Sequence, residues 1–194
     1  MEAAEELLAE GDTDRAIDKL QEAVAVNPGN DAARADYLHA LLGAGRIDEA
    51  RRVYEPVASK VIPHARLTAI GHWLAALEAA PEARTADALQ TAIAANKRDF
   101  DARFELAQSH FAAQRFTAAM DELLEIVMRD KTWRDELARK NYVAILELMT
   151  KPAAAAKAEA AAPKGKLEIA GKSLAASSDP VVDSYRRKLS MALF

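Results

Sequence analysis

Apolar side chains recur every three to four residues along most of this chain, which is the period expected of amphipathic helices. Polar stretches that contain Gly or Pro interrupt this pattern and separate the segments from one another. Two single helices are predicted near the end, over 133–149 and 180–194. The preceding segments fall into consecutive pairs, predicted over 2–10 and 13–26, 31–43 and 47–59, 64–79 and 83–95, and 100–113 and 116–130.

A skeleton of small and apolar residues recurs within these pairs. It begins at Gly11 and again 34 residues later at Gly45, and a degraded copy begins at Gln114. A Gly between two helices suits a turn with positive φ, and a Pro after the second helix ends it. The three copies are Gly11, Ala16, Leu20, Ala23 and Pro28; Gly45, Ala50, Tyr54, Val57 and Ile62; and Gln114, Ala119, Leu123, Ile126 and Lys131.

This period and skeleton resemble the tetratricopeptide repeat, a helix–turn–helix unit of about 34 residues. The resemblance predicts an all-α fold, a right-handed superhelical stack of about four helix pairs with a capping helix and a C-terminal helix. No single repeat can bury its apolar face alone, so neighbouring repeats stack. Stacks of this kind are almost always binding scaffolds. The predicted organisation is a repeat domain with its cap over 1–149, an Ala/Lys/Pro-rich linker or insertion over 150–178, and an amphipathic helix over 179–194.

Charge is distributed unevenly along the chain. Residues 151–194 hold eight basic and four acidic groups, a net charge of +4, which leaves −8 for residues 1–150 of the total of −4. An acidic repeat domain argues against nucleic-acid binding. No apolar run approaches the length of a membrane span, so no membrane contact is expected. The acidic N-terminal segment lacks the basic region of a secretory signal, which favours a cytoplasmic location.

The residues of catalytic and metal sites do not cluster in this sequence. Cysteine is absent, and the four histidines are far apart and form no paired ligand motif. No phosphate-binding loop, dinucleotide-binding motif or serine nucleophile motif occurs. We therefore expect a protein that is not an enzyme and that has no catalytic residue, metal or cofactor.

The register of the repeats predicts a concave groove lined by the first helix of each pair. Two aromatic residues, Phe104 and Phe111, are the predicted anchors for an extended or helical partner segment. The alternative is that they pack between repeats or under the closing helix. Trp73 and Trp133 are expected in the core. The predicted groove residues are His39, Leu42, Phe104, Gln108 and Phe111.

Two passages resemble the bacterial chaperedoxin family (YbbN/CnoX type), whose members join a thioredoxin-fold domain to a repeat domain. Phe100-Asp101-Ala102-Arg103-Phe104-Glu105-Leu106-Ala107, with Leu123-Leu124-Glu125-Ile126-Val127, is similar to its fourth repeat. Asp179-Pro180-Val181-Val182-Asp183-Ser184-Tyr185-Arg186-Arg187-Lys188-Leu189, ending in Leu193-Phe194, is similar to its final helix. This sequence contains no thioredoxin domain, and its segment 150–178 looks inserted.

The resemblance implies a chaperone that binds unfolded or oxidised clients and passes them to the chaperonin GroEL through its final helix. It also implies that the partner-binding residues are Tyr185, Arg186, Arg187, Leu189, Leu193 and Phe194. Two alternatives stay open. One is an assembly scaffold with its final helix fixed on its own chain and a ligand in the groove. The other is an enzyme or an enzyme's accessory domain, which a separate catalytic domain upstream would support. The sequence does not decide the oligomeric state.

Overall fold

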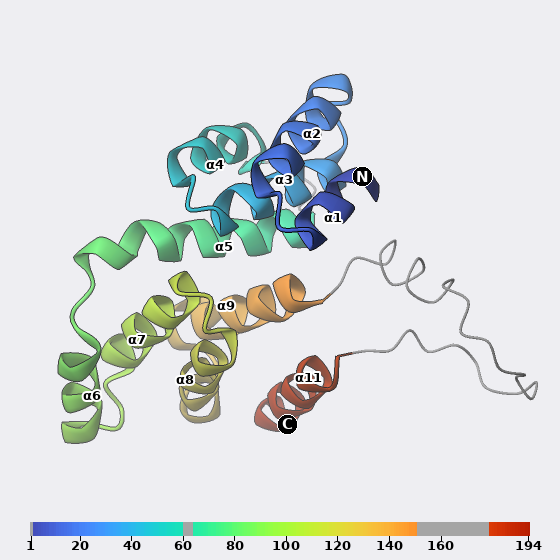
Figure 1. The fold of residues 1–194 in the computed structure, drawn as a ribbon. Coiled ribbons are helices and arrows are strands. Elements are labelled where there is room, and N and C mark those ends of the chain that lie inside the picture. Colours follow the sequence, from blue (N-terminus) through green and yellow to red (C-terminus); the bar gives the residue numbers. More distant parts are fainter. Residues whose placement is uncertain (1, 60–63, 151–178) are drawn as a thin grey trace, which may run out of the picture.

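The computed structural model describes residues 2–59, 64–150 and 179–194, and every regular element among them is helical. The chain begins with two antiparallel helix pairs, shown in blue to cyan in Figure 1. The second helix of each pair packs against the first helix of its own pair and of the next. These elements are α1 (Glu2–Ala9), α2 (Thr13–Val26), α3 (Asp31–Gly43) and α4 (Ile47–Tyr54), which a short 3₁₀ turn (Glu55–Val57) extends.

The turns inside the pairs have the backbone conformation that the skeleton predicts. Gly11 has a φ of 82° and Gly45 a φ of 73°, both in the left-handed region. Gln114 takes the equivalent position of the degraded copy and also has a positive φ, of 57°. The degraded turn therefore keeps its geometry without the residue that adopts it most readily.

Polar side chains begin several of the helices, as local capping rules predict. Asn30 accepts a hydrogen bond from the backbone N–H of Ala33, and Asp99 accepts one from Ala102. Asp12 and Thr85 make the equivalent bonds at the starts of α2 and of α6 (Ala86–Ala95). These caps satisfy N–H groups that have no partner inside the helix.

The second half of the chain closes four helices into a ring. α5 packs on α7, α7 on α8, α8 on α9, and α9 returns to pack on α5. Trp73, Phe111 and Tyr142, from three of these helices, are completely buried in the shared core. The bounds are α5 (Ala65–Ala79), α7 (Phe100–Ala112), α8 (Phe116–Arg129) and α9 (Trp133–Met149).

The predicted third helix pair does not form. α6 (Ala86–Ala95) follows a 3₁₀ turn (Ala80–Glu82) and packs on α7, and it is not among the helices that pack on α5. Its buried residues, Leu89 and Ile93, belong to a small cluster separate from the main core. Figure 1 shows α6 below the end of α5 rather than alongside it. The periodicity predicted the helix but not its packing partner.

The predicted capping helix differs from expectation in its first turn. Arg134, Asp135 and Glu136 all have positive φ, so the regular right-handed part of α9 begins at Leu137. Ion pairs connect this turn to its surroundings, from Arg134 to Asp101 at 2.9 Å and from Lys140 to Asp135 at 2.8 Å.

The last helix, α11 (Pro180–Leu193), packs on α8 and α9. In Figure 1 it lies beside α8, at the end of the molecule opposite α1 and α2. The fold is therefore the predicted all-α stack of tetratricopeptide-like helix pairs, extended by a closing helix and a docked final helix. Ile62, the last position of the second skeleton copy, and the predicted linker from residue 151 onward lie outside the described residues.

Candidate functional site

The helix α9 fills the part of the predicted groove that α7 lines. Phe104 packs against Trp133, with ring centroids 5.2 Å apart. The Gln108 side-chain amide donates a hydrogen bond of 3.0 Å to Asn141, which is itself buried and donates to the Leu137 carbonyl. Two predicted groove residues, Phe104 and Gln108, are thus in contact with α9 of the same chain.

At the other end of the predicted groove, α3 faces α5. His39 is partly buried with its ring centroid 5.4 Å from that of Trp73. Burial lowers the pKa of His39, and the nearby Arg66 guanidinium lowers it further. Arg66 also donates to Asp36 at 2.5 Å, yet burial holds the pKa of that carboxyl above its usual range. This end is polar, compact and largely internal.

Two predicted groove residues need correction. Leu42 is 2% exposed and Phe111 is 0% exposed, because both pack into the main core. Neither can contact a partner in this structure. For Phe111 and Phe104 the alternative interpretation, packing between repeats or under the closing helix, describes what the structure shows. Trp73 is completely buried, as expected for a core residue.

The final helix starts as its sequence predicts. Asp179 accepts a hydrogen bond of 2.8 Å from the Val181 N–H, and Pro180 occupies the first turn. Val182, Tyr185 and Leu189 lie at spacings of three and four and are buried on the core side. Each contributes on the order of 1.5–3 kcal/mol when its apolar surface leaves water. This stripe therefore docks α11 on its own chain.

Polar contacts fix the direction of the docked helix. The Tyr185 hydroxyl donates to Asp121 at 3.0 Å, and the Lys131 ammonium donates to the Leu193 carbonyl at 2.6 Å. Tyr185 lies opposite Asp121 within α8, and Leu193 lies opposite Lys131 just beyond the end of α8, so the two helices run in the same direction. Lys188 lies 4.1 Å from the centroid of the Tyr185 ring, above its face, and 3.4 Å from Asp121. This network encloses Tyr185 from two sides.

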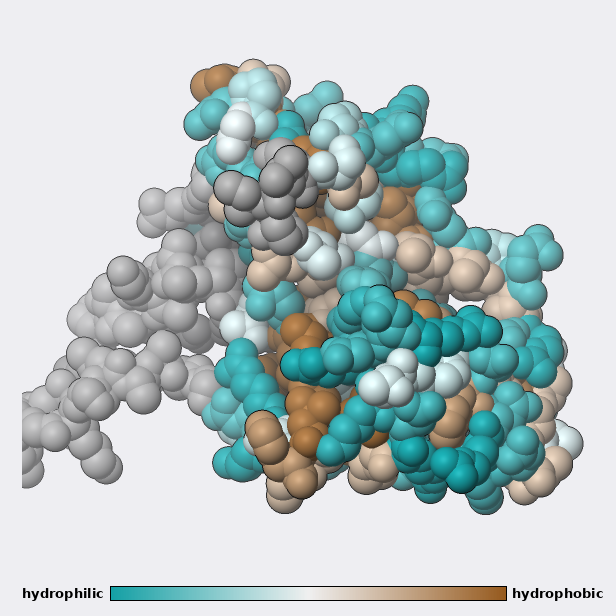
Figure 2. All heavy atoms as spheres, turned by 180° about the vertical axis from the view of Figure 1, so that it is seen from behind, coloured by the Kyte–Doolittle hydropathy of each residue, from teal (hydrophilic) through white to brown (hydrophobic). Residues whose placement is uncertain are grey.

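The opposite face of α11 is exposed. Phe194 is 103% exposed and Met191 is 74% exposed. Arg187 is exposed as well, and it has no ion-pair partner within residues 2–59, 64–150 and 179–194. Arg186 is exposed but forms an ion pair with Asp183 at 3.5 Å. Seen from behind in Figure 2, the lower half of the molecule combines exposed hydrophobic surface with hydrophilic side chains.

The six tail residues predicted to bind a partner therefore divide into two groups. Tyr185 and Leu189 face the chain itself, while Arg186, Arg187 and Phe194 face outward and Leu193 is half-buried. Met191 was missed by the sequence interpretation. Its signal is the spacing, since it lies four residues after Arg187 and three before Phe194, on the same face of a helix.

The described part of the chain holds no group of three or more His, Asp or Glu side chains arranged for a metal ion. Within the same residues, none of the helices is both long enough and apolar enough to cross a bilayer.

Two family models match the chain, and both describe the tetratricopeptide repeat. One matches residues 7–61 and the other residues 79–161. The first covers most of the two N-terminal helix pairs, and the second begins at the end of α5 and runs beyond α9. No curated protein matches the chain.

Proposed function

We propose that this chain, whose two matched repeat regions show a tetratricopeptide repeat domain, is a protein-binding module that presents the outer face of α11 to a chaperonin of the GroEL type. Tetratricopeptide repeats generally mediate protein–protein interaction, and their fold is typically non-catalytic. The chaperonin, and a role in delivering unfolded or oxidised clients to it, come from the likeness of the tail to the chaperedoxin final helix.

One observation carries the proposal: α11 exposes one face to solvent while its opposite face is packed on α8 and α9. Val182, Tyr185 and Leu189 hold the helix in place, so the helix is already formed before any partner arrives. A pre-formed helix loses less conformational freedom on binding than a disordered segment does. Arg187, Met191 and Phe194 then offer an apolar contact beside a positive charge.

The proposal assigns different roles to the tail residues. Arg186, Arg187 and Phe194 contact the chaperonin, with Leu193 at the edge of the contact. Tyr185 and Leu189 position the helix from its buried side. Replacing Tyr185 or Leu189 therefore weakens binding through loss of the docked helix rather than through loss of a direct contact.

A pull-down with purified GroEL tests this assignment. The wild-type chain is retained, and both the chain lacking residues 179–194 and the double variant Arg187→Glu/Phe194→Ser are lost. Val26→Ser is the matched control, because Val26 is 87% exposed on α2 at the opposite end of the molecule. Retention of the double variant at the wild-type level overturns the assignment.

The alternative is an assembly scaffold that binds its partner elsewhere and uses α11 only to close the stack. The intramolecular docking of α11 is the observation that favours it. The contacts of α9 with Phe104 and Gln108, and the burial of Leu42 and Phe111, count against a ligand in the predicted groove. A folded chain with protected α11 amides and no affinity for GroEL supports this alternative.

A further inference from the structure

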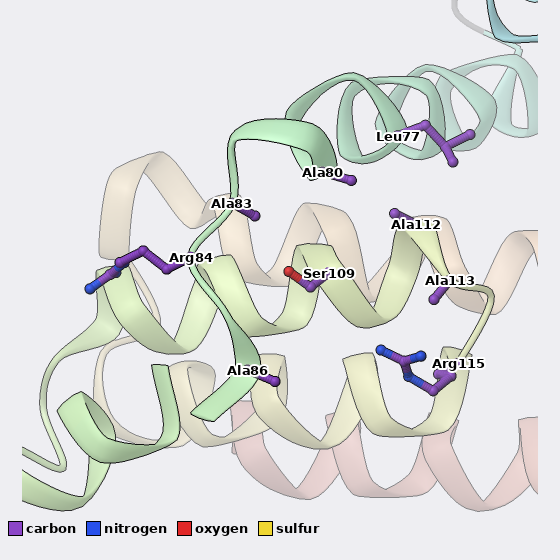
Figure 3. A pocket seen from close by; sticks show the side chains of 9 residues that line it. All are labelled: Leu77, Ala80, Ala83, Arg84, Ala86, Ser109, Ala112, Ala113 and Arg115. Carbon is purple, nitrogen blue, oxygen red and sulfur yellow. The ribbon is translucent and has the colours of Figure 1, made fainter. Parts of the chain in front are cut away.

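A hollow of about 470 Å³ opens between the C-terminal ends of α5 and α7 and the start of α6 (Figure 3). Leu77 and five alanines form most of its lining. Ser109 and two arginines, Arg84 and Arg115, complete it. Small side chains allow the backbone of another element to approach closely, and packed helices lie about 8–10 Å apart.

The hollow lies where the repeat architecture places a helix. In the first pair, α2 packs on both α1 and α3, and in the second pair α4 packs on both α3 and α5. The corresponding helix of the third pair, α6, packs on α7, while α5 and α7 contact each other without it. The outer side of the α5–α7 contact therefore lacks the helix that covers it in the other repeats.

Contacts between Arg84, in the segment that joins α5 to α6, and Glu105 of α7 hold α6 away from the α5–α7 contact. The Arg84 backbone N–H donates to Glu105 at 2.6 Å, and its guanidinium donates to the same carboxylate at 2.7 and 2.9 Å. α6 itself packs through Leu89 and Ile93 into the separate small cluster. These contacts direct α6 toward the N-terminal half of α7, so α6 does not cover the outer side of the C-terminal half.

The charge at the rim of the hollow is not balanced. Glu105 neutralises Arg84, but Arg115 has no carboxylate partner within the described parts of the chain. The Arg115 guanidinium donates to His110 Nδ1 at 3.0 Å. Burial lowers the pKa of His110, and Arg115 lowers it further against a smaller opposing effect of Glu122. Figure 3 shows the Arg115 guanidinium turned toward the hollow.

We propose that the hollow binds an amphipathic helix of a partner protein, which takes the place of the second helix of the third repeat. Its apolar side packs on Leu77 and the alanines. An acidic side chain at its edge pairs with Arg115, whose planar guanidinium suits a carboxylate. This surface is separate from the outer face of α11, so the inference does not depend on the chaperonin proposal.

A peptide of residues 13–26 is a suitable probe, because this sequence forms α2 and performs the same packing role in the first repeat. It also carries the exposed acids Asp14, Asp18 and Glu22. The fluorescein-labelled peptide is titrated with the full chain and its fluorescence anisotropy is measured. Two variants address the hollow: Ala113→Trp fills it, and Arg115→Glu reverses the charge at its rim.

The expected result is saturable binding to the wild-type chain that weakens at least about tenfold in each variant, which corresponds to about 1.4 kcal/mol. Arg52→Glu on α4 is the matched control and leaves the affinity unchanged, because Arg52 is exposed and does not line the hollow. Circular dichroism confirms that the variants fold. Failure of the peptide to bind the wild-type chain, or equal binding by wild type and both variants, overturns the proposal.

Discussion

The hydroxyl of Tyr142 on α9 donates a buried hydrogen bond of 2.8 Å to the backbone carbonyl of Tyr185 on α11. The two rings lie with their centroids 6.4 Å apart. Burial raises the pKa of Tyr142 far above its usual value, so its hydroxyl remains a donor at any physiological pH. This contact joins the closing helix of the stack to the final helix, although 43 residues separate the two along the chain.

Tyr142→Phe removes this bond and keeps the packing of the ring. We expect the free energy of unfolding to fall by about 0.5–1.5 kcal/mol, the net value of one such bond. Urea unfolding measures the loss as a lower midpoint with an unchanged slope. Tyr37→Phe on α3 is the matched control, since Tyr37 is also buried but lies outside the α9–α11 contact. A larger loss in the control than in Tyr142→Phe contradicts the assignment.

The left-handed turn residue of the degraded repeat makes a second prediction. A non-Gly residue in this conformation is strained by about 1–2 kcal/mol, so Gln114→Gly should stabilise the chain by about 0.5–1 kcal/mol. The converse change, Gly45→Gln, should destabilise by about 1 kcal/mol, because Gly45 has a positive φ and open space around it. Thermal unfolding of both variants checks the pair. Shifts in the same direction would show that φ does not govern these positions.

Gly71 inside α5 is required by close packing rather than by its φ. A Cβ there would overlap the Tyr54 hydroxyl and lie 2.7 Å from Tyr54 Cζ. We expect Gly71→Ala to cost about 1–3 kcal/mol through overpacking, despite the better helix propensity of Ala. Adding Tyr54→Phe should recover part of this cost by removing the overlapping oxygen. Gly43→Ala is the control, since nothing lies within 4 Å of a Cβ at that position.

Two half-buried histidines should make the chain less stable in mild acid. Burial lowers the pKa of both His39 and His72, and neighbouring cations, Arg66 and Lys140 respectively, lower them further. The unfolded chain therefore binds protons first as the pH falls through about 6.5, and stability is lost in that direction. Urea midpoints between pH 7.5 and 5.5 measure the slope, which His39→Gln should flatten.

Asp36 acts in the opposite sense, because burial raises its pKa and the folded state then binds a proton more readily. Asp36 therefore affects the free energy of unfolding mainly at lower pH, in the range where carboxyl groups titrate. A midpoint that does not change between pH 7.5 and 5.5 would contradict the histidine prediction.

Local features of the fold could be predicted from the sequence because they depend on neighbouring residues. The turn at Gly11, the cap at Asp179 and the bounds of α2 and α3 all follow from spacing and capping chemistry. The position of α6 could not be predicted, because its separation from α5 depends on the Arg84–Glu105 clamp. No periodic pattern encodes a contact of that kind.

The candidate site was predicted only in part, for the same reason. The register predicted Phe104, Gln108 and Phe111 on one open face, but it could not show that α9 contacts Phe104 and Gln108 or that Phe111 is buried in the core. The apolar stripe of the tail predicted that the final helix docks, but it did not show whether the helix docks on its own chain or on another protein. That Tyr185 faces Asp121 of the same chain depends on a contact between residues far apart in the sequence.

The central claim is that the outer face of α11 contacts a chaperonin while its inner face stays docked. Site-specific photo-crosslinking tests this claim most directly, with benzoylphenylalanine in place of Phe194 and, in a control chain, in place of Val26 at the opposite end. Both positions are highly exposed. The account predicts a covalent adduct with the GroEL subunit from position 194 and none from position 26. No adduct from position 194, or equal adducts from both positions, would contradict it.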